Sequence, residues 1–286
     1  MSSVALFHRD TPYPHWEFAS NSGDLLRVVP ERGGLVTGWR SNGKELIYLD
    51  IERFLDPAKS VRGGIPILFP ICGGLPGNTL PLPQGNFPLG QHGFARQLPW
   101  QLTALEDGQG IALELKDSEP TLKSYPFSFL LRLELRLGAG ALEIDTSVHN
   151  RSQEPMPFSF GLHPYFNLSN LNNPCFEGLP ERCLNHLSMA DADTNEEIGQ
   201  MANGIDLLVR PSGDVRLVDQ EAGLALDLQL TAPFNLVVIW TEPPRQMVCL
   251  EPWTGPRQAL ISGDGKLEIA SGESCSLATR YAVSTC

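Results

Sequence analysis

Two titratable residues of this chain lie in strongly apolar stretches, where little water is expected to stabilise a charge. His163 lies in the run PMPFSFGLHPYFNLS (155–169), among phenylalanine, leucine and tyrosine residues. Glu251 lies between the apolar run QMVCL and the dipeptide Pro252-Trp253. A desolvated imidazole or carboxylate needs a partner, and desolvation raises the pKa of a carboxylate toward neutrality. A histidine and a glutamate in such settings predict general acid/base catalysis, although a core histidine bonded to the backbone would also fit.

Two further stretches place polar side chains beside glycines. The segment VRGGIPILFP (61–70) carries Arg62 ahead of a buried run, and GQHGFARQLPW (90–100) carries His92 and Arg96. Arg62 could simply face solvent at a turn, and the second segment could be a structural loop. Taken together with the histidine and the glutamate, they favour a site that binds a small polar ligand.

The composition argues against several classes of function. Acidic residues outnumber basic ones 33 to 21, for a formal net charge of −12, so we expect no nucleic-acid partner. No stretch approaches the roughly 18 apolar residues of a membrane helix, and the N-terminus lacks the layout of a secretory signal. We therefore expect a cytoplasmic protein without a membrane partner. The six cysteines form no C-x-x-C pair, so we expect reduced thiols, no metal site and no cofactor.

Alternation of apolar and polar residues recurs along the chain, whereas helical periodicity is scarce. Glycine and proline, 27 and 24 residues, interrupt the runs too often for helical crossovers between parallel strands. The sequence therefore predicts an all-β sandwich of antiparallel strands, as one domain over residues 1–286. Half-buried strands are expected at 131–137, 141–148, 224–230 and 266–271, and a strand buried on both faces at 234–241.

One segment interrupts this pattern. Residues 73–96 are dense in glycine, proline and asparagine and show no sustained periodicity. We expect a long ordered loop there, and long loops inside compact domains often bind ligands or cover sites.

Four stretches in order resemble the aldose 1-epimerase, or galactose mutarotase-like, family. They are VRGGIPILFP, QHGFAR, GLHPYF and LEPWTGP, which together span most of the chain, and the branch they resemble contains hexose-6-phosphate mutarotases. The resemblance implies a galactose mutarotase-like β-supersandwich, in agreement with the strand pattern. It also implies an isomerase that interconverts the α and β anomers of a hexose or a hexose 6-phosphate.

The resemblance also implies roles for the two acid/base residues. Mutarotation opens the sugar ring by removing a proton from the anomeric hydroxyl while the ring oxygen is protonated, and then closes it on the other face. Glu251 matches the base at the anomeric oxygen O1, and His163 matches the acid at the ring oxygen. The proline that follows the histidine, Pro164, departs from the small polar residue common there, which bears on substrate choice rather than on catalysis.

The substrate contacts that the resemblance implies are less sharply defined. Arg62 and His92 match positions that hold sugar hydroxyls, and Gln91 and Arg96 match contacts in the phosphosugar branch. Arg62 and Arg96 could bind a phosphate in a bidentate manner. One aspartate is also expected to contact the sugar. Asp206 is our choice, with Asp214 and Asp219 close to it in the sequence.

Three other readings of the same residues stay open. The groove could hold sugar without catalysis, although a pure binder needs no proton donor and acceptor. A glycoside hydrolase would need a second carboxylate, for which Glu177 and Asp145 lack a supporting motif. A metalloenzyme could use His92, His149, His163 and Glu251, but the spacing matches no metal motif. We expect a monomer acting on a small sugar or sugar phosphate.

Overall fold

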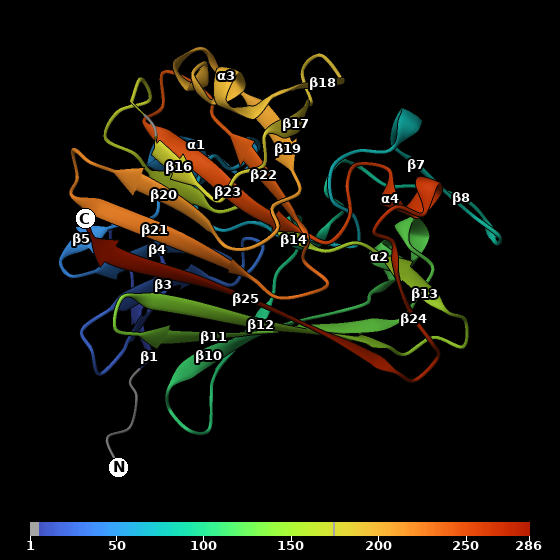
Figure 1. Ribbon diagram of the computed structural model, residues 1–286. Helices are drawn as coiled ribbons and strands as arrows, with labels where there is room; N and C mark the ends of the chain where they lie inside the picture. Colours follow the sequence, from blue (N-terminus) through green and yellow to red (C-terminus); the bar gives the residue numbers. More distant parts are fainter. Residues whose placement is uncertain (1–5, 174) are drawn as a thin grey trace.

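The computed structural model describes residues 6–173 and 175–286, and the strands in this part of the chain pair in antiparallel fashion (Figure 1). The first sheet has five strands: β1 (Leu6–Arg9), β2 (His15–Ala19), β3 (Leu25–Val29), β4 (Leu35–Ser41) and β5 (Lys44–Glu45), in sequence order. The chain is therefore the all-β protein that its alternating pattern predicts.

Two eight-stranded sheets form the rest of the sandwich. One has the order β16-β20-β21-β25-β12-β11-β10-β9 and contains β9 (Gln101–Ala104), β10 (Gly110–Lys116), β11 (Phe129–Gly138), β12 (Ala141–Asn150), β16 (Cys175–Glu177), β20 (Val215–Asp219), β21 (Leu224–Leu230) and β25 (Ser274–Thr285). The other has the order β18-β17-β19-β22-β23-β14-β6, with β15 also paired to β23, and contains β6 (Ile67–Leu68), β14 (Gly161–Leu162), β15 (Tyr165–Asn167), β17 (Arg182–Asn185), β18 (Ala190–Asp193), β19 (Asp206–Val209), β22 (Leu236–Trp240) and β23 (Met247–Trp253).

Short elements complete the structure. Two isolated strand pairs are β7 (Thr79–Leu82) with β8 (Gly85–Pro88), and β13 (Met156–Phe158) with β24 (Leu267–Ile269). The helices are short: α1 (Ile51–Leu55), α2 (Glu119–Ser124), α3 (Thr194–Ile198), α4 (Ala259–Ser262) and the 3-10 turns η1 (Pro76–Asn78), η2 (Ala95–Gln97) and η3 (Met201–Asn203). None of the helices in the described residues has the length and apolarity needed to cross a bilayer.

The predicted strands are confirmed closely where alternation is regular. The segment 131–137 lies within β11, whose residues alternate between buried and half-buried positions, and 224–230 coincides with β21. The largely apolar segment 234–241 contains β22, a central strand of its sheet that is buried from Leu236 to Ile239. Alternation therefore marks the strands with one wet face, and a continuous apolar run marks a central one.

The two large sheets are joined through a shared apolar core. Tyr281 of β25 packs its ring 5.2 Å from that of Phe166 in β15, and its hydroxyl donates a hydrogen bond of 3.1 Å to the backbone oxygen of Leu250 in β23. Since all three residues are fully or almost fully buried, this contact fixes β23 against the sheet below it in Figure 1. Strands β23 and β15 are therefore held in place by contacts with β25.

The prediction of a continuous loop at 73–96 is wrong in part. This segment contains the β7–β8 hairpin, which projects beside α4 at one side of the molecule (Figure 1). Leu80 is fully buried and pairs with Phe87, so the hairpin has one apolar face. Prolines at 81, 83 and 88 concealed this alternation in the sequence, because proline is depleted in strands and occurs mainly on short edge strands such as these.

The six cysteines form no disulfide in the structure, and their reduced state stays a prediction. One large cluster of buried apolar residues draws on all three main sheets, from Phe18 in β2 to Tyr281 in β25. The organisation of residues 1–286 as one domain stays a prediction, since residues 1–5 lie outside the described part of the chain.

Candidate active site

One cavity of about 240 Å³ gathers the side chains to which the sequence pointed. Its lining includes Arg62, Gln91, His92, Arg96, His163, Asp206 and Glu251, which come from five separate segments of the chain. The structure thus brings all seven predicted site residues together. Their individual roles stay predictions.

The register of the sheet places the acid/base residues opposite one another. In β14, Gly161 pairs with Trp253, and in β15, Tyr165 pairs with Cys249. Extending this antiparallel register between the two pairs puts His163 directly across from Glu251. The backbone N–H of His163 donates to the oxygen of Pro66 at 2.9 Å, which holds the break between β14 and β15 in place.

The two side chains are in direct contact. Nε2 of His163 lies 3.3 Å from Oε1 of Glu251, and the two side chains are 12% and 1% exposed. The imidazole stacks on Tyr165, with ring centroids 4.8 Å apart, and meets the edge of Trp240. The other carboxyl oxygen of Glu251 accepts a 3.1 Å hydrogen bond from the indole N–H of Trp253. Aromatic rings therefore hold both groups in a single orientation.

Burial decides how this pair carries its proton. Desolvation raises the pKa of Glu251 well above its ordinary value, with the nearby Asp206 adding to the effect. Desolvation also lowers the pKa of His163 to about 3, with the positive charge of Arg96 as the next cause. Burial therefore favours a neutral pair that shares one proton, and its titration belongs to the pair as a whole.

The stability of the protein should depend on this pair in a way that can be measured. Above pH 4.5, the ordinary pKa of a glutamic acid, unfolding releases the proton that buried Glu251 retains, so its contribution to the free energy of unfolding falls as the pH rises. As long as the pH stays below the raised pKa of Glu251, the slope approaches about 1.4 kcal/mol per pH unit. We expect Glu251→Gln to gain stability relative to the wild type between pH 6 and pH 8, as measured by urea unfolding. A stability difference that does not change with pH would contradict a raised pKa at Glu251.

His92 is oriented by the backbone of Gly73. The N–H of Gly73 donates to Nδ1 of His92 at 3.1 Å, and the N–H of His92 donates back to the oxygen of Gly73 at 2.7 Å. Burial, followed by the nearby His163, lowers the pKa of His92 well below its usual range. A neutral His92 whose Nδ1 accepts a hydrogen bond must carry its proton on Nε2. The ring is thus prepared to donate a hydrogen bond to a ligand in the cavity.

The two arginines predicted to bind a phosphate differ in whether a carboxylate already pairs with them. Arg62 already uses its guanidinium fork on Glu242, with Nε and Nη2 at 2.8 and 3.3 Å from the two carboxylate oxygens. Arg96 donates only to the backbone oxygen of Gln91, at 3.0 Å, and forms no ion pair within the described residues. Burial lowers the pKa of Arg96. Arg96 is therefore the cation that an anionic ligand would neutralise.

The choice of Asp206 among three nearby aspartates agrees with the geometry. Asp206 begins β19 and lines the cavity beside Trp240, its partner in β22. Asp214 is exposed just before β20, and Asp219 lines a different cavity. Its contact with a ligand stays a prediction, but no other member of the three can reach this site.

The sequence reasoning missed several residues of the site. Arg257, Trp240 and Ser60 line the cavity, and Arg257 forms a 2.7 Å ion pair with Asp206. Arg257 directly follows the LEPWTGP stretch, so a basic residue one position beyond the motif was a visible signal. Trp240 and Ser60 carried no such signal, because their positions depend on long-range strand pairing.

The rival readings of the sequence find less support. Glu177 is exposed on β16 and Asp145 lies on β12 in a separate cavity, so neither supplies a second carboxylate here. His149 is bonded to the backbone oxygen of Glu273 on the far sheet, so the proposed four-residue metal set does not assemble.

One potential set of metal donors does exist in the described residues. Donor atoms of His163, Cys249 and Glu251 lie within 4.8 Å of one another. Nitrogen, sulfur and oxygen donors of this kind suit zinc. Cys249, however, is fully buried and does not line the cavity, so the set shares only its imidazole and carboxylate with the open site.

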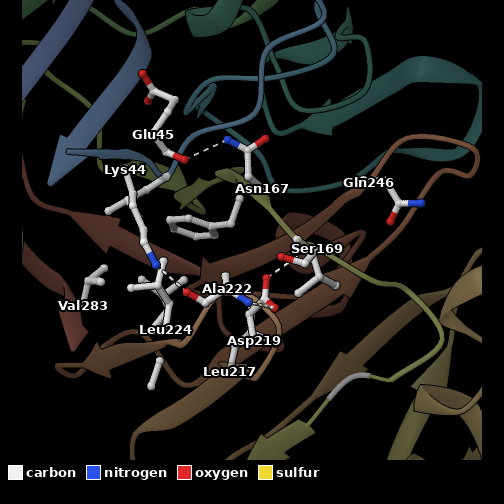
Figure 2. Close-up of a pocket in the computed structure, with 15 residues that line it drawn as sticks. Lys44, Glu45, Asn167, Ser169, Leu217, Asp219, Ala222, Leu224, Gln246 and Val283 are labelled. Atoms are coloured by element: carbon white, nitrogen blue, oxygen red, sulfur yellow. Dashed lines mark hydrogen bonds between the residues drawn. The ribbon is translucent and has the colours of Figure 1, made fainter. Parts of the chain in front are cut away.

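A second cavity, of about 370 Å³, lies between β5, β15, β20, β21 and β25 (Figure 2). Its polar groups are engaged with one another: Lys44 donates to the backbone oxygen of Ala222, and Asp219 accepts from the N–H of Ser169 at 2.8 Å. The rest of its described lining is largely leucine and alanine, without histidine or cysteine. The candidate acid/base residues therefore lie in the other cavity, around His163 and Glu251.

Comparisons with known proteins agree with this site. The family model for aldose 1-epimerase matches residues 19–282. A protein of Cenchrus ciliaris named "Putative glucose-6-phosphate 1-epimerase" is 36% identical over 159 residues, which is 51% of this chain and 45% of that protein. The alignment thus spans under half the length of this relative.

Solved structures extend the agreement to the whole fold. The Slr1438 protein of Synechocystis superposes with a TM-score of 0.91 at 33% identity, covering 100% of both chains. A galactose mutarotase related enzyme of Lactobacillus acidophilus has a TM-score of 0.79 at 22% identity, covering 95% of this chain and 97% of its own. The predicted galactose mutarotase-like β-sandwich is confirmed.

Proposed function

This chain belongs to the aldose 1-epimerase family, and on that premise we propose that it interconverts the α and β anomers of a hexose 6-phosphate. The observation that carries the proposal is the His163–Glu251 pair, two proton-transfer groups 3.3 Å apart at the floor of a cavity that also presents cationic side chains. The reaction needs these two functions, a base and an acid acting on one hemiacetal.

The pair carries one proton in total, and the reaction moves that proton without consuming it. With the proton on His163, Glu251 takes the proton of O1 while His163 protonates the ring oxygen, and the C1–O5 bond breaks. The open-chain aldehyde then faces a protonated Glu251 and a neutral His163. This is the distribution that burial favours in the empty site. Rotation about C1–C2 and reversal of the transfers close the ring on the other face.

Positive charge around the cavity favours a phosphorylated substrate. Arg62, Arg96 and Arg257 line it, against the two carboxyl groups of Asp206 and Glu251. Since Glu251 favours its neutral form, the cavity has excess positive charge, and Arg96 has no carboxylate partner within the described residues. A phosphate dianion would supply that partner through charge-assisted hydrogen bonds.

We expect Arg96→Met to separate phosphorylated from free sugar. Losing a charge-assisted hydrogen bond costs about 1.5–3 kcal/mol, so kcat/KM for glucose 6-phosphate should fall roughly 10- to 100-fold. Exchange of free glucose anomers should change less than about threefold, because no phosphate is present to bind. Anomer exchange by NMR on both sugars measures the effect, with Arg96→Lys as the variant that keeps the charge. An equal loss of kcat/KM on the two sugars would show that Arg96 does not bind the phosphate.

The same measurement on the wild type tests the function itself. Accelerated anomer exchange that disappears in variants of the catalytic pair supports the mutarotase proposal. Binding of glucose 6-phosphate without acceleration would instead indicate a carbohydrate-binding protein.

The setting of the protein is also part of the proposal. Six free thiols suit a reducing compartment, and we propose a cytoplasmic monomer that acts on a small phosphosugar without a nucleic-acid or membrane partner.

A further inference from the structure

The carboxylate of Asp206 is held at both of its oxygens. Nδ1 of His186 lies 2.7 Å from Oδ1, and Nη2 of Arg257 lies 2.7 Å from Oδ2. The backbones of His186 and Asp206 are also hydrogen-bonded, since the N–H of His186 donates to the backbone oxygen of Asp206 at 2.7 Å. A carboxylate only accepts hydrogen bonds, so His186 must carry its proton on Nδ1. We call His186, Asp206 and Arg257 the Asp206 clamp.

His186 does not line the cavity but contacts two residues that do, Asp206 and Trp253. Its side chain is 1% exposed, and its ring stacks on Trp253 with centroids 6.4 Å apart and planes 29° apart. Trp253 in turn donates its indole N–H to Glu251. The same histidine therefore orients Asp206 directly and packs against the ring that orients the catalytic carboxyl.

Arg257 reaches the cavity along a path that requires a glycine. A Cβ at Gly73 would lie 2.3 Å from Cγ of Arg257, so any larger residue would displace the arginine. Gly73 also holds His92 through two backbone hydrogen bonds. Nε of Arg257 is buried without a partner in the described residues, and Asp206 is the acceptor of its one ion pair there. The guanidinium therefore keeps donors that the protein does not use.

Beyond the sugar contact that the resemblance implies for Asp206, we propose that Arg257 contacts a hydroxyl of the sugar ring and that His186 is a positioning residue for Asp206. The proposal rests on the mutarotase function proposed above. With one lone pair of each oxygen engaged, the remaining lone pairs of Asp206 point in fixed directions and can accept from sugar hydroxyls. The free donors of Arg257 complete the pattern of donor and acceptor that a sugar hydroxyl needs.

The role of His186 can be tested with two matched variants. His186→Phe keeps a ring against Trp253 but removes the donor, whereas His186→Asn offers an amide N–H near the position of Nδ1. We expect His186→Phe to raise KM for glucose 6-phosphate roughly 10-fold with little change in kcat, and His186→Asn to stay within about threefold of the wild type. A wild-type KM in His186→Phe, or equal KM values in the two variants, would overturn the positioning role.

Arg257→Met tests the substrate contact. Because the clamp binds ring hydroxyls, kcat/KM should fall roughly 10- to 100-fold, and by the same factor for glucose and glucose 6-phosphate. A loss confined to the phosphorylated sugar, or no loss, would overturn this assignment.

The dissociation constant for glucose 6-phosphate, measured by calorimetry, separates failure of the clamp from failure of the proposed function. A wild type that binds the sugar but does not accelerate exchange would end the mutarotase proposal. The clamp would then still be judged by whether His186→Phe and Arg257→Met weaken binding by the factors expected above, and unchanged binding would overturn it.

Discussion

Glu251→Gln is expected to reduce catalysed anomer exchange of glucose 6-phosphate by about 10²- to 10⁴-fold in kcat/KM, the range typical of a positioned general base. Glutamine has the shape of glutamate and can still accept the hydrogen bond from Trp253, but it cannot take a proton from O1. The neutral amide also matches the neutral form that burial favours at this position. The loss should therefore lie in proton transfer and not in the shape of the cavity.

The control for this variant is binding. The dissociation constant for glucose 6-phosphate should stay within about threefold of the wild-type value, because the cationic and hydroxyl-binding residues are untouched. Thermal unfolding at pH 8 should show a melting temperature equal to or above that of the wild type. Exchange within tenfold of the wild-type rate would rule out Glu251 as the base and would direct attention to Asp206, the other carboxylate of the cavity.

The fold could be predicted from the sequence wherever one face of a strand meets water. Leucines and charged residues of β11 alternate from Leu131 to Leu137, and burial alternates from Leu142 to Asn150 in its partner β12. Such alternation can be seen within each strand alone, without knowledge of which strand pairs with it. The β7–β8 hairpin was not predicted. Its strands have only four residues each and contain prolines, so the single fully buried residue, Leu80, was too weak a sign of a strand.

The acid/base pair could be found in the sequence because burial of a titratable group leaves a local trace. His163 and Glu251 each interrupt an apolar run, and that interruption is visible without any knowledge of the partner. Neither Arg257 nor His186 interrupts an apolar run in this way, although Arg257 directly follows the LEPWTGP stretch. Arg257 depends on the missing side chain of Gly73, and His186 depends on the register that brings the end of β17 beside β19. Those are contacts between distant segments, which periodicity does not encode.

The structure also shows how the proposed acid and base lie relative to one another. The sequence led us to expect two groups flanking one hemiacetal, and the structure shows them touching, with 3.3 Å between Nε2 and Oε1. Two polar groups at this distance can bridge the anomeric oxygen and the ring oxygen, which share one carbon atom. A base and an acid for neighbouring oxygens should be close together, so direct contact in the empty site suits the reaction. The contact also gives Nε2 of His163 and Oε1 of Glu251 a polar neighbour, whereas Nδ1 of His163 is buried without a partner in the described residues.

Because the two groups share one proton, the second large effect is predicted at His163. We expect His163→Gln to lower kcat/KM for glucose 6-phosphate by about 10²- to 10⁴-fold, since an amide can fill part of the space and donate a hydrogen bond but cannot deliver a proton to the ring oxygen. Exchange NMR gives the rate, and calorimetric binding of glucose 6-phosphate shows whether the cavity is intact. The double variant with Glu251→Gln should be no slower than the slower single variant within a factor of about ten, because residues that act as one unit are not additive. Multiplied losses in the double variant would show instead that each residue transfers its proton independently, and the single shared proton of the mechanism would have to be abandoned.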